Sequence, residues 1–234
     1  MNGEIKRELI SLADRSTAEF SKKLISTKAE IMGVKTPLLK RMAKEISKGD
    51  YKSFLGDPQY GTYEETAIRA LVISYAKMPH EERMSLIADF VPHIDNWGIC
   101  DLFTSSLRPV IKKNQSEFWS FIQEYLYSGD EFKIRFGLVV ILVGFVSKEY
   151  AAPAFDVLDS VDLRSYYAMM GAAWVLSEFY IKLPEITTSY LLNNRLDDIT
   201  YNKAISKMLD SYRVSDKDKA ALRLMKRKGK SALI

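Results

Sequence analysis

The sequence contains one cysteine, Cys100, and two histidines, His80 and His93, among its 234 residues. A single cysteine forms no intrachain disulfide, which suits a reducing compartment, and we expect a cytoplasmic protein. Two histidines without a second cysteine are too few ligands for a typical zinc site, so we expect no metal and no other cofactor. Residues 1–8 have no apolar core, so we also expect no signal peptide.

Long hydrophobic runs and strand patterns are missing as well. The longest apolar run, from Phe136 to Val146, is too short to cross a bilayer, and we expect no membrane association. No segment alternates apolar and polar residues, and no Asn-Gly or Asp-Gly pair joins two such segments. No low-complexity linker divides the chain. The sequence therefore predicts an all-α protein with a single domain, residues 1–234.

Apolar residues recur at helical spacing between recognisable start and stop signals. Thr36 is expected to cap a helix that begins with Pro37 and ends before a left-handed Gly49. Ser16 or Thr17, Thr62, Asp95 and Asp130 are further expected caps. Pro109 predicts an irregular segment, 105–111. The other expected helices are 3–13, 18–26, 51–55, 63–77, 79–90, 116–127, 131–146, 149–158, 165–179, 184–192, 197–210 and 215–228.

The central stretch from Asp95 to Asp101 has the most distinctive chemistry. If a helix starts at Asp95, Trp97 and Asp101 lie four residues apart on one helix face. An indole beside a carboxylate is suited to a cationic sugar or base, because the ring face and the carboxylate both attract positive charge. The alternative is a buried tryptophan with an aspartate at its edge.

Short helices in antiparallel pairs, repeating every ~35–45 residues, predict an α-solenoid of HEAT-like repeats. Candidate site residues follow the same rhythm, with 34 positions from Asp101 to Arg135 and 39 from Arg135 to Trp174. We therefore expect a right-handed superhelix that carries Trp97, Asp101, Arg135 and Trp174 on its concave face.

Four features together resemble the DNA alkylation repair glycosylases of the AlkD type, a HEAT-like-repeat family, over most of the chain. They are the segment Gly33–Pro37 before a basic helix, the Trp97/Asp101 pair, Arg135 beside an aliphatic helix, and Trp174 within Ala172–Leu176. The resemblance implies a monomeric enzyme that acts on double-stranded DNA. It would hydrolyse the N-glycosidic bond of N3- and N7-alkylated purines, without the deep pocket of base-flipping enzymes.

The resemblance also implies roles for individual residues. Asp101 would stabilise the oxocarbenium-like sugar or position water, Trp97 and Trp174 would pack against the deoxyribose, and Arg135 would bind a phosphate. Arg135 could instead pair with Glu131 on its own helix. Basic side chains expected to contact the DNA backbone are Lys40, Arg41, Lys44, Lys203 and Arg227. The basic residues form two clusters: Lys40, Arg41 and Lys44 in one, and Arg223, Lys226, Arg227, Lys228 and Lys230 at the C-terminal end in the other. For both clusters, the alternative is a charged face that is exposed to solvent.

Two positions and one helix depart from the pattern that the resemblance leads us to expect. Asn96 stands where an aromatic residue is expected, Ser177 replaces a basic residue, and the second helix offers only Phe20 as an aromatic contact. Three interpretations stay open: an active glycosylase, a family member with lost or altered excision that binds DNA weakly, and a HEAT-like protein-interaction module.

Overall fold

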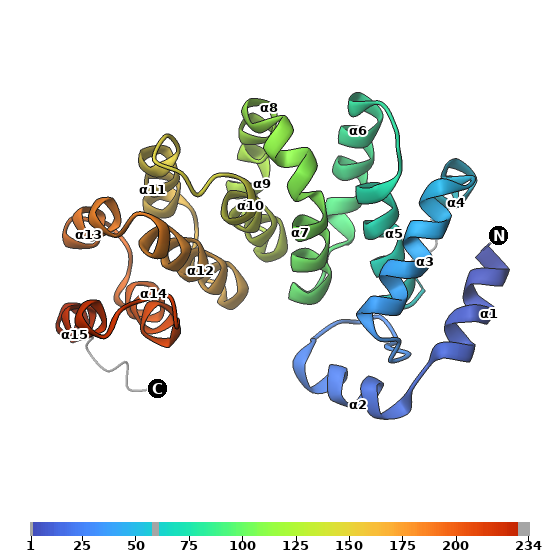
Figure 1. Ribbon diagram of the computed structural model, residues 1–234, viewed down its shortest axis with the longest axis horizontal. Coiled ribbons are helices and arrows are strands. Elements are labelled where there is room, and N and C mark those ends of the chain that lie inside the picture. The colour runs from blue at the N-terminus through green and yellow to red at the C-terminus, as the bar shows by residue number, and fades with distance from the viewer. Residues whose placement is uncertain (1, 58–60, 229–234) are drawn as a thin grey trace. The chain divides into compact units, whose positions relative to one another are not determined.

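The computed structural model describes residues 2–57 and 61–228, and within these ranges all regular elements are helices (Figure 1). The one extended pairing in the described chain is an isolated β-bridge between Glu30 and Thr62. The all-α prediction is confirmed. No helix in these ranges is both long and apolar enough to span a membrane. Lys230, which belongs to the predicted C-terminal basic cluster, lies outside the described residues.

Contacts between residues divide the chain into two compact units, 1–110 and 111–234, and the division falls within helix α7 (Trp97–Lys113). The expectation of a single domain stays a prediction. The first unit contains α1 (Asn2–Leu12), α2 (Arg15–Leu24), α3 (Thr36–Lys48), α4 (Tyr51–Gly56), α5 (Tyr63–Tyr75), α6 (His80–Phe90), the 3₁₀ turn η1 (Val91–His93) and most of α7. The second contains α8 (Gln115–Phe121), α9 (Gln123–Leu126), α10 (Glu131–Gly144), α11 (Ala151–Ser160), α12 (Tyr166–Lys182), α13 (Pro184–Leu192), α14 (Asp198–Asp210) and α15 (Asp216–Met225).

The core of the first unit is built around α5, which packs against α3 and α6. The predicted cap, Thr62, is confirmed: its hydroxyl accepts the Glu65 N–H while the Glu65 carboxylate accepts the Thr62 N–H, a reciprocal capping box. Ten of the thirteen residues of α5 are buried. The other three, Tyr63, Glu65 and Tyr75, are partly buried, so no residue of this helix is fully exposed to solvent.

Two buried arginines close helix ends in the same unit. Arg69 donates to the backbone carbonyls of Leu55, in the last turn of α4, and of Asp57, just after it. Arg83 donates to the carbonyl of Ala76, just after α5, at 2.7 Å. Helix ends leave carbonyls without intrahelical donors, and these guanidinium groups supply them. Burial lowers the pKa of Arg83 below its usual value.

The second unit is organised around α10, whose residues from Ile134 to Gly144 are all buried. The all-round apolar sequence of this segment predicted such burial. Helix α10 packs against α12, α12 packs against α14, and α11 contacts α13, so α10, α12 and α14 make one layer of the unit (Figure 1). Asp130 caps α10 by accepting the Phe132 and Lys133 N–H groups, as the sequence predicted.

Two expectations about helix boundaries are wrong. Pro109 does not end the helix that starts at Trp97, because α7 continues through it to Lys113. Leu107 and Ile111 on either side of the proline are fully buried, and their packing offsets the backbone bond that proline removes. The segment expected as one helix, 116–127, divides at Ile122 into α8 and α9.

Several expected caps are also wrong. Helix α2 is capped by Asp14, whose carboxylate accepts the Thr17 N–H at 2.7 Å, and not by Ser16 or Thr17. Thr36 is already the first residue of α3 and makes no cap bond. Gly49 follows α3 with φ −95°, outside the left-handed region. Hydrogen bonds from Ser16 and Thr17 lower the pKa of Asp14 to about 2.

Candidate functional site

A hollow of about 420 Å³ in the first unit is lined by both Trp97 and Asp101, and we call it the Trp97 pocket. The two side chains face it from the first turns of α7, as their four-residue spacing predicts. Both are partly buried. Other walls come from α2, from the loop before α3, and from the starts of α3 and α5, with Lys35, Lys40 and Tyr63 among the lining residues.

The start of α7 is fixed by Asn96 rather than by Asp95, which corrects the expected cap. The Asn96 side-chain oxygen accepts the Ile99 N–H at 2.9 Å, and Asn96 is buried. Asp95 instead accepts the Thr27 hydroxyl at 2.7 Å and the Lys28 N–H at 3.2 Å. Asn96 thus caps α7, and Asp95 connects the start of α7 to the loop after α2 by hydrogen bonds.

The indole of Trp97 has a fixed orientation. Its ring N–H donates to the backbone carbonyl of Leu24 at 2.9 Å, at the last residue of α2. The C-terminal end of α2 offers free carbonyls, so the bond satisfies a helix end and a partly buried indole at once. Phe20 and Leu24 are themselves exposed on α2, at 64% and 51%.

Another wall of the Trp97 pocket is the loop before α3, which includes Val34, and a buried carboxylate holds this loop. Glu64, 1% exposed, accepts the backbone N–H groups of Met32, Gly33 and Val34 at 3.1, 2.8 and 3.2 Å. Gly33 has φ +89°, and a Cβ there would lie 2.2 Å from the Asp14 carbonyl oxygen. Only glycine allows this loop to pass so close to the start of α2.

Tyr63, the first residue of α5, brings a phenol into the Trp97 pocket. Burial, followed by the negative charges of Glu64 and Asp101, raises the pKa of Tyr63 to about 12. The phenol therefore stays protonated across the physiological range. Its backbone N–H donates to the Glu30 carbonyl at 2.9 Å, which fixes the start of the helix.

The two remaining candidate residues of the predicted site, Arg135 and Trp174, belong to the second unit. Arg135 is 6% exposed and donates to the Tyr167 carbonyl at 3.0 Å, while Glu131 accepts the Tyr167 N–H at 2.6 Å. Arg135 and Glu131 thus both bind the peptide groups of Tyr167 at the start of α12. Trp174 lies partly buried in the middle of the same helix.

The basic residues expected to contact the DNA backbone differ in their exposure to solvent. Lys40, Arg41 and Lys44 are exposed on α3 without an ion-pair partner in the described chain, and Lys40 also lines the Trp97 pocket. Lys203 is partly buried on α14. Three basic side chains on one exposed helix face form the candidate nucleic-acid contact in the first unit.

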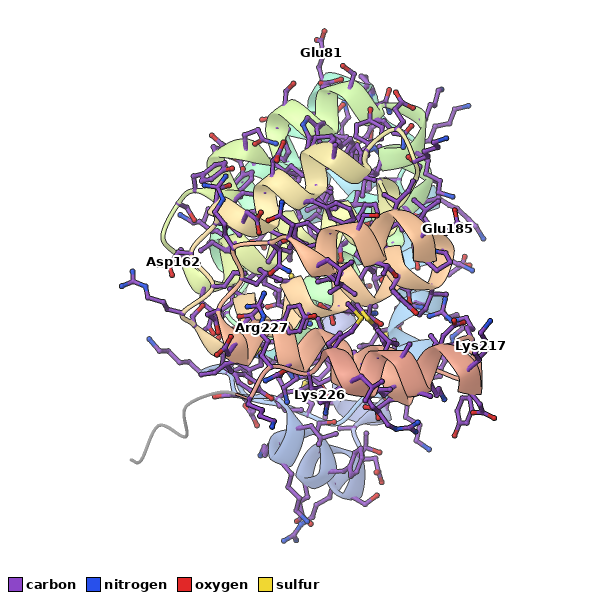
Figure 2. All side chains as sticks on the ribbon, turned by 90° about the vertical axis from the view of Figure 1, so that its left-hand side faces the viewer. Glu81, Asp162, Glu185, Lys217, Lys226 and Arg227 are labelled. Atoms are coloured by element: carbon purple, nitrogen blue, oxygen red, sulfur yellow. The ribbon has the colours of Figure 1, made fainter. Side chains whose placement is uncertain are left out.

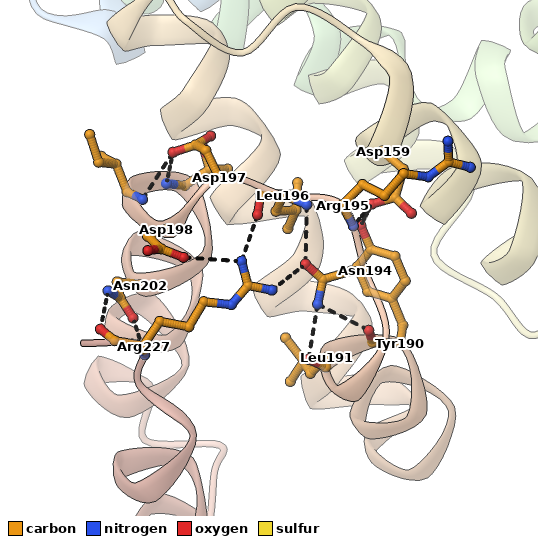
Figure 3. A network of polar contacts seen from close by, with 12 residues as sticks. Asp159, Tyr190, Leu191, Asn194, Arg195, Leu196, Asp197, Asp198, Asn202 and Arg227 are labelled. Carbon is orange, nitrogen blue, oxygen red and sulfur yellow. Dashed lines mark hydrogen bonds and ion pairs between the residues drawn. The ribbon is translucent and has the colours of Figure 1, made fainter. Parts of the chain in front are cut away.

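Arg227 is engaged within its own unit. Its guanidinium extends from the end of α15 to the loop between α13 and α14, where it donates to the Leu196 carbonyl at 2.6 Å and to the Asn194 side chain at 2.9 Å (Figure 3). It also lies 3.9 Å from the centre of the Tyr201 ring and 3.4 Å from Asp198. In Figure 2, Lys226 and Arg227 appear together at the end of α15.

The loop that Arg227 holds forms part of a larger hollow in the second unit, about 610 Å³, which none of the predicted site residues lines. Its carboxylates already have donors: Asp159 accepts the Tyr190 hydroxyl at 2.7 Å and the Arg195 N–H at 2.9 Å (Figure 3). Burial, followed by the hydrogen bond with Asp159, raises the pKa of Tyr190. The size of a hollow is therefore a poor guide to function here, and we place the candidate site at the Trp97 pocket for its chemistry.

Sequence reasoning identified the Trp97/Asp101 pair but missed Tyr63, Glu64 and the cap at Asn96. An acidic residue in the first turn of a helix, such as Glu64, looks like a solvated charge, and nothing local shows that it binds a loop thirty residues away. In the described ranges, no three of the residues that usually bind metals come together as a possible metal site.

Comparison with protein-family models identifies a family for this chain. The model for DNA alkylation repair enzymes matches residues 5–208, a range that includes the Trp97 pocket and the candidate residues of the second unit up to Lys203. Comparison with curated proteins gives no match.

Proposed function

The chain belongs to the family of DNA alkylation repair enzymes, and from this premise we propose that it excises cationic N3- or N7-alkylated purines from double-stranded DNA. The observation that carries the proposal is the Trp97 pocket, where an indole and a carboxylate face one hollow in a chain of this family. We also propose that the helix pairs of each unit are HEAT-like repeats, supported by the consecutive packing of α10, α12 and α14.

The proposed reaction is hydrolysis of the bond between C1′ and the purine nitrogen. An alkylated purine already carries positive charge, so its departure needs little help from an acid. As the bond breaks, its electron pair moves to the purine and positive charge develops on the sugar. The Asp101 carboxylate stabilises this charge and accepts a proton from the attacking water, and the face of Trp97 stabilises the charge further.

The proposed roles of the second unit come from the family resemblance. Arg135 contacts a phosphate and Trp174 offers a second aromatic face to the cationic sugar. Lys40, Arg41 and Lys44 contact the DNA backbone in a manner independent of sequence. We propose a smaller contribution from Arg227, because its guanidinium already binds Leu196 and Asn194.

A direct test is the release of 7-methylguanine and 3-methyladenine from methylated DNA by the wild-type protein and by Asp101→Asn. The asparagine keeps the shape and removes the charge, so we expect release to slow by about 10²–10³, the scale seen when one electrostatic stabiliser is lost. Asp89→Asn is a matched control, since Asp89 is exposed on α6 and does not line the pocket. Equal rates for wild type and Asp101→Asn would contradict the mechanism.

A second candidate function is DNA binding without excision. It is favoured by the short α2, whose one aromatic residue is Phe20. The same assay separates the two candidates, because a protein of the second kind would bind a methylated duplex and release no base from it.

A further inference from the structure

The hydroxyl of Tyr63 is a polar group in the Trp97 pocket to which the family resemblance assigns no role. Tyr63 is held at the first position of α5 by two sets of backbone bonds. Its own N–H donates to Glu30, and the preceding residue, Thr62, is locked into the capping box with Glu65. The side chain therefore enters the pocket from a rigid base.

The hydroxyl lies directly against α7. A Cβ placed on Gly98 would be 2.8 Å from the Tyr63 hydroxyl oxygen, which is closer than such atoms approach in proteins. Gly98 precedes Asp101 by three residues and therefore lies on the neighbouring turn of the same helix face. Tyr63, Gly98 and Asp101 all line the Trp97 pocket. Glycine at position 98 thus makes room for a hydroxyl beside Asp101.

The Tyr63 hydroxyl can donate one hydrogen bond and has no partner for it within the described chain. The charged groups around it are Glu64 on its own helix, Asp101 on α7, and Lys35 and Lys40 on the wall formed by α3 and the loop before it. Burial, followed by the charges of Glu64 and Asp101, raises the pKa of the Tyr63 phenol to about 12. Two polar groups that face one hollow and act on each other through charge are well placed to share a bridging water.

We propose that the Tyr63 hydroxyl and the Asp101 carboxylate hold between them the water molecule that attacks C1′ of the damaged nucleotide. This inference rests on the proposed glycosylase function and adds a residue to it. The water accepts a hydrogen bond from Tyr63, donates one to Asp101, and directs its remaining lone pair at the sugar. The bond from C1′ to water oxygen forms as the bond to the purine breaks, the electron pair leaves with the purine, and the released proton passes to Asp101.

The test is Tyr63→Phe, which removes one oxygen atom and retains the ring. Single-turnover release of 7-methylguanine is measured together with the affinity for the same methylated duplex. We expect release to slow by roughly tenfold to a hundredfold, the range for loss of one positioned donor, with affinity unchanged. Gly98→Ala, which must displace the hydroxyl, is expected to slow release similarly. Tyr75→Phe is the matched control, because Tyr75 ends the same helix and does not line the pocket.

The outcomes separate this inference from the function on which it rests. A Tyr63→Phe protein that releases base as fast as wild type overturns the role of Tyr63 and leaves the glycosylase proposal standing. Slower release explained entirely by weaker DNA binding also overturns it, because a water-positioning group acts on the chemical step. A wild-type protein that releases no base overturns both. The release rates of wild type and Tyr63→Phe are also compared between pH 6 and 9. If the variant is slower only at the alkaline end of this range, Tyr63 acts as a titrating base. That result would contradict a hydroxyl that donates a hydrogen bond throughout the range.

Discussion

Replacing Glu64 with glutamine should loosen the loop that forms one wall of the Trp97 pocket. The buried carboxylate accepts the N–H groups of Met32, Gly33 and Val34, two of them on Oε1 and one on Oε2. A glutamine side chain has the same shape but offers one oxygen and one NH₂ group. If its oxygen keeps the two bonds at the Oε1 position, its NH₂ faces the Met32 N–H and a donor meets a donor.

The cost follows from these three bonds. A buried N–H left without an acceptor costs about 1–3 kcal/mol, and this applies to Met32. Bonds to a charged acceptor are roughly twice as strong as neutral ones, so the bonds from Gly33 and Val34 lose about 1 kcal/mol more between them. Removing a buried charge recovers part of its desolvation. We therefore expect Glu64→Gln to lower the free energy of unfolding by about 2–3 kcal/mol.

The assay is equilibrium urea unfolding followed by circular dichroism, combined with hydrogen exchange at the Met32, Gly33 and Val34 amides. Glu64→Gln should unfold at lower urea and exchange faster at these three amides. Glu81→Gln is the control: Glu81 is exposed in the first turn of α6, so its replacement should change stability by less than about 0.5 kcal/mol. An unchanged midpoint together with unchanged exchange would refute the idea that this carboxylate holds the loop.

Other predictions concern the same loop and the basic residues. Gly33 has φ +89°, and Gly33→Ala places a methyl group 2.2 Å from the Asp14 carbonyl oxygen. In the same assay, this variant should lower the free energy of unfolding by more than about 2 kcal/mol. Arg227→Lys keeps the charge but not the planar fork, and should lower stability by about 1–2 kcal/mol while DNA affinity is retained; a large affinity loss would instead support a DNA contact. Replacing Lys40, Arg41 and Lys44 with alanine should weaken DNA binding and reduce the slope of log affinity against log salt by about 0.9 per lost contact, measured by fluorescence anisotropy.

Much of the fold was predictable where a boundary depends on neighbouring residues alone. Pro184 opens α13 and the helix matches its expected bounds, because proline at a first position needs no partner elsewhere. Thr62 and Asp130 cap their helices for the same local reason. Pro109 shows the limit of local reasoning: it breaks a helix by propensity, yet α7 continues because the turns on either side of it are buried.

The candidate site was predictable along one helix and unpredictable between helices. Trp97 and Asp101 share a face through helix periodicity, which can be read from sequence. Tyr63 and Glu64 meet that helix and the loop before α3 through tertiary contacts, and no spacing rule relates residues 31 positions apart, such as Gly33 and Glu64. Asp95 was misjudged for a related reason: its best acceptor role lies 68 positions away, at Thr27.

Asn96 illustrates how a departure from a family pattern can have a structural meaning. An aromatic residue is expected before Trp97, but an aromatic side chain cannot accept the Ile99 N–H that the Asn96 oxygen accepts at 2.9 Å. The asparagine therefore supplies the cap that fixes the start of α7. That start sets the direction of Trp97 and Asp101, and it frees Asp95 to hold the loop after α2. In this chain, the residue next to the candidate catalytic pair thus serves its geometry, and we expect contact with DNA to depend on exposed basic side chains such as those of α3.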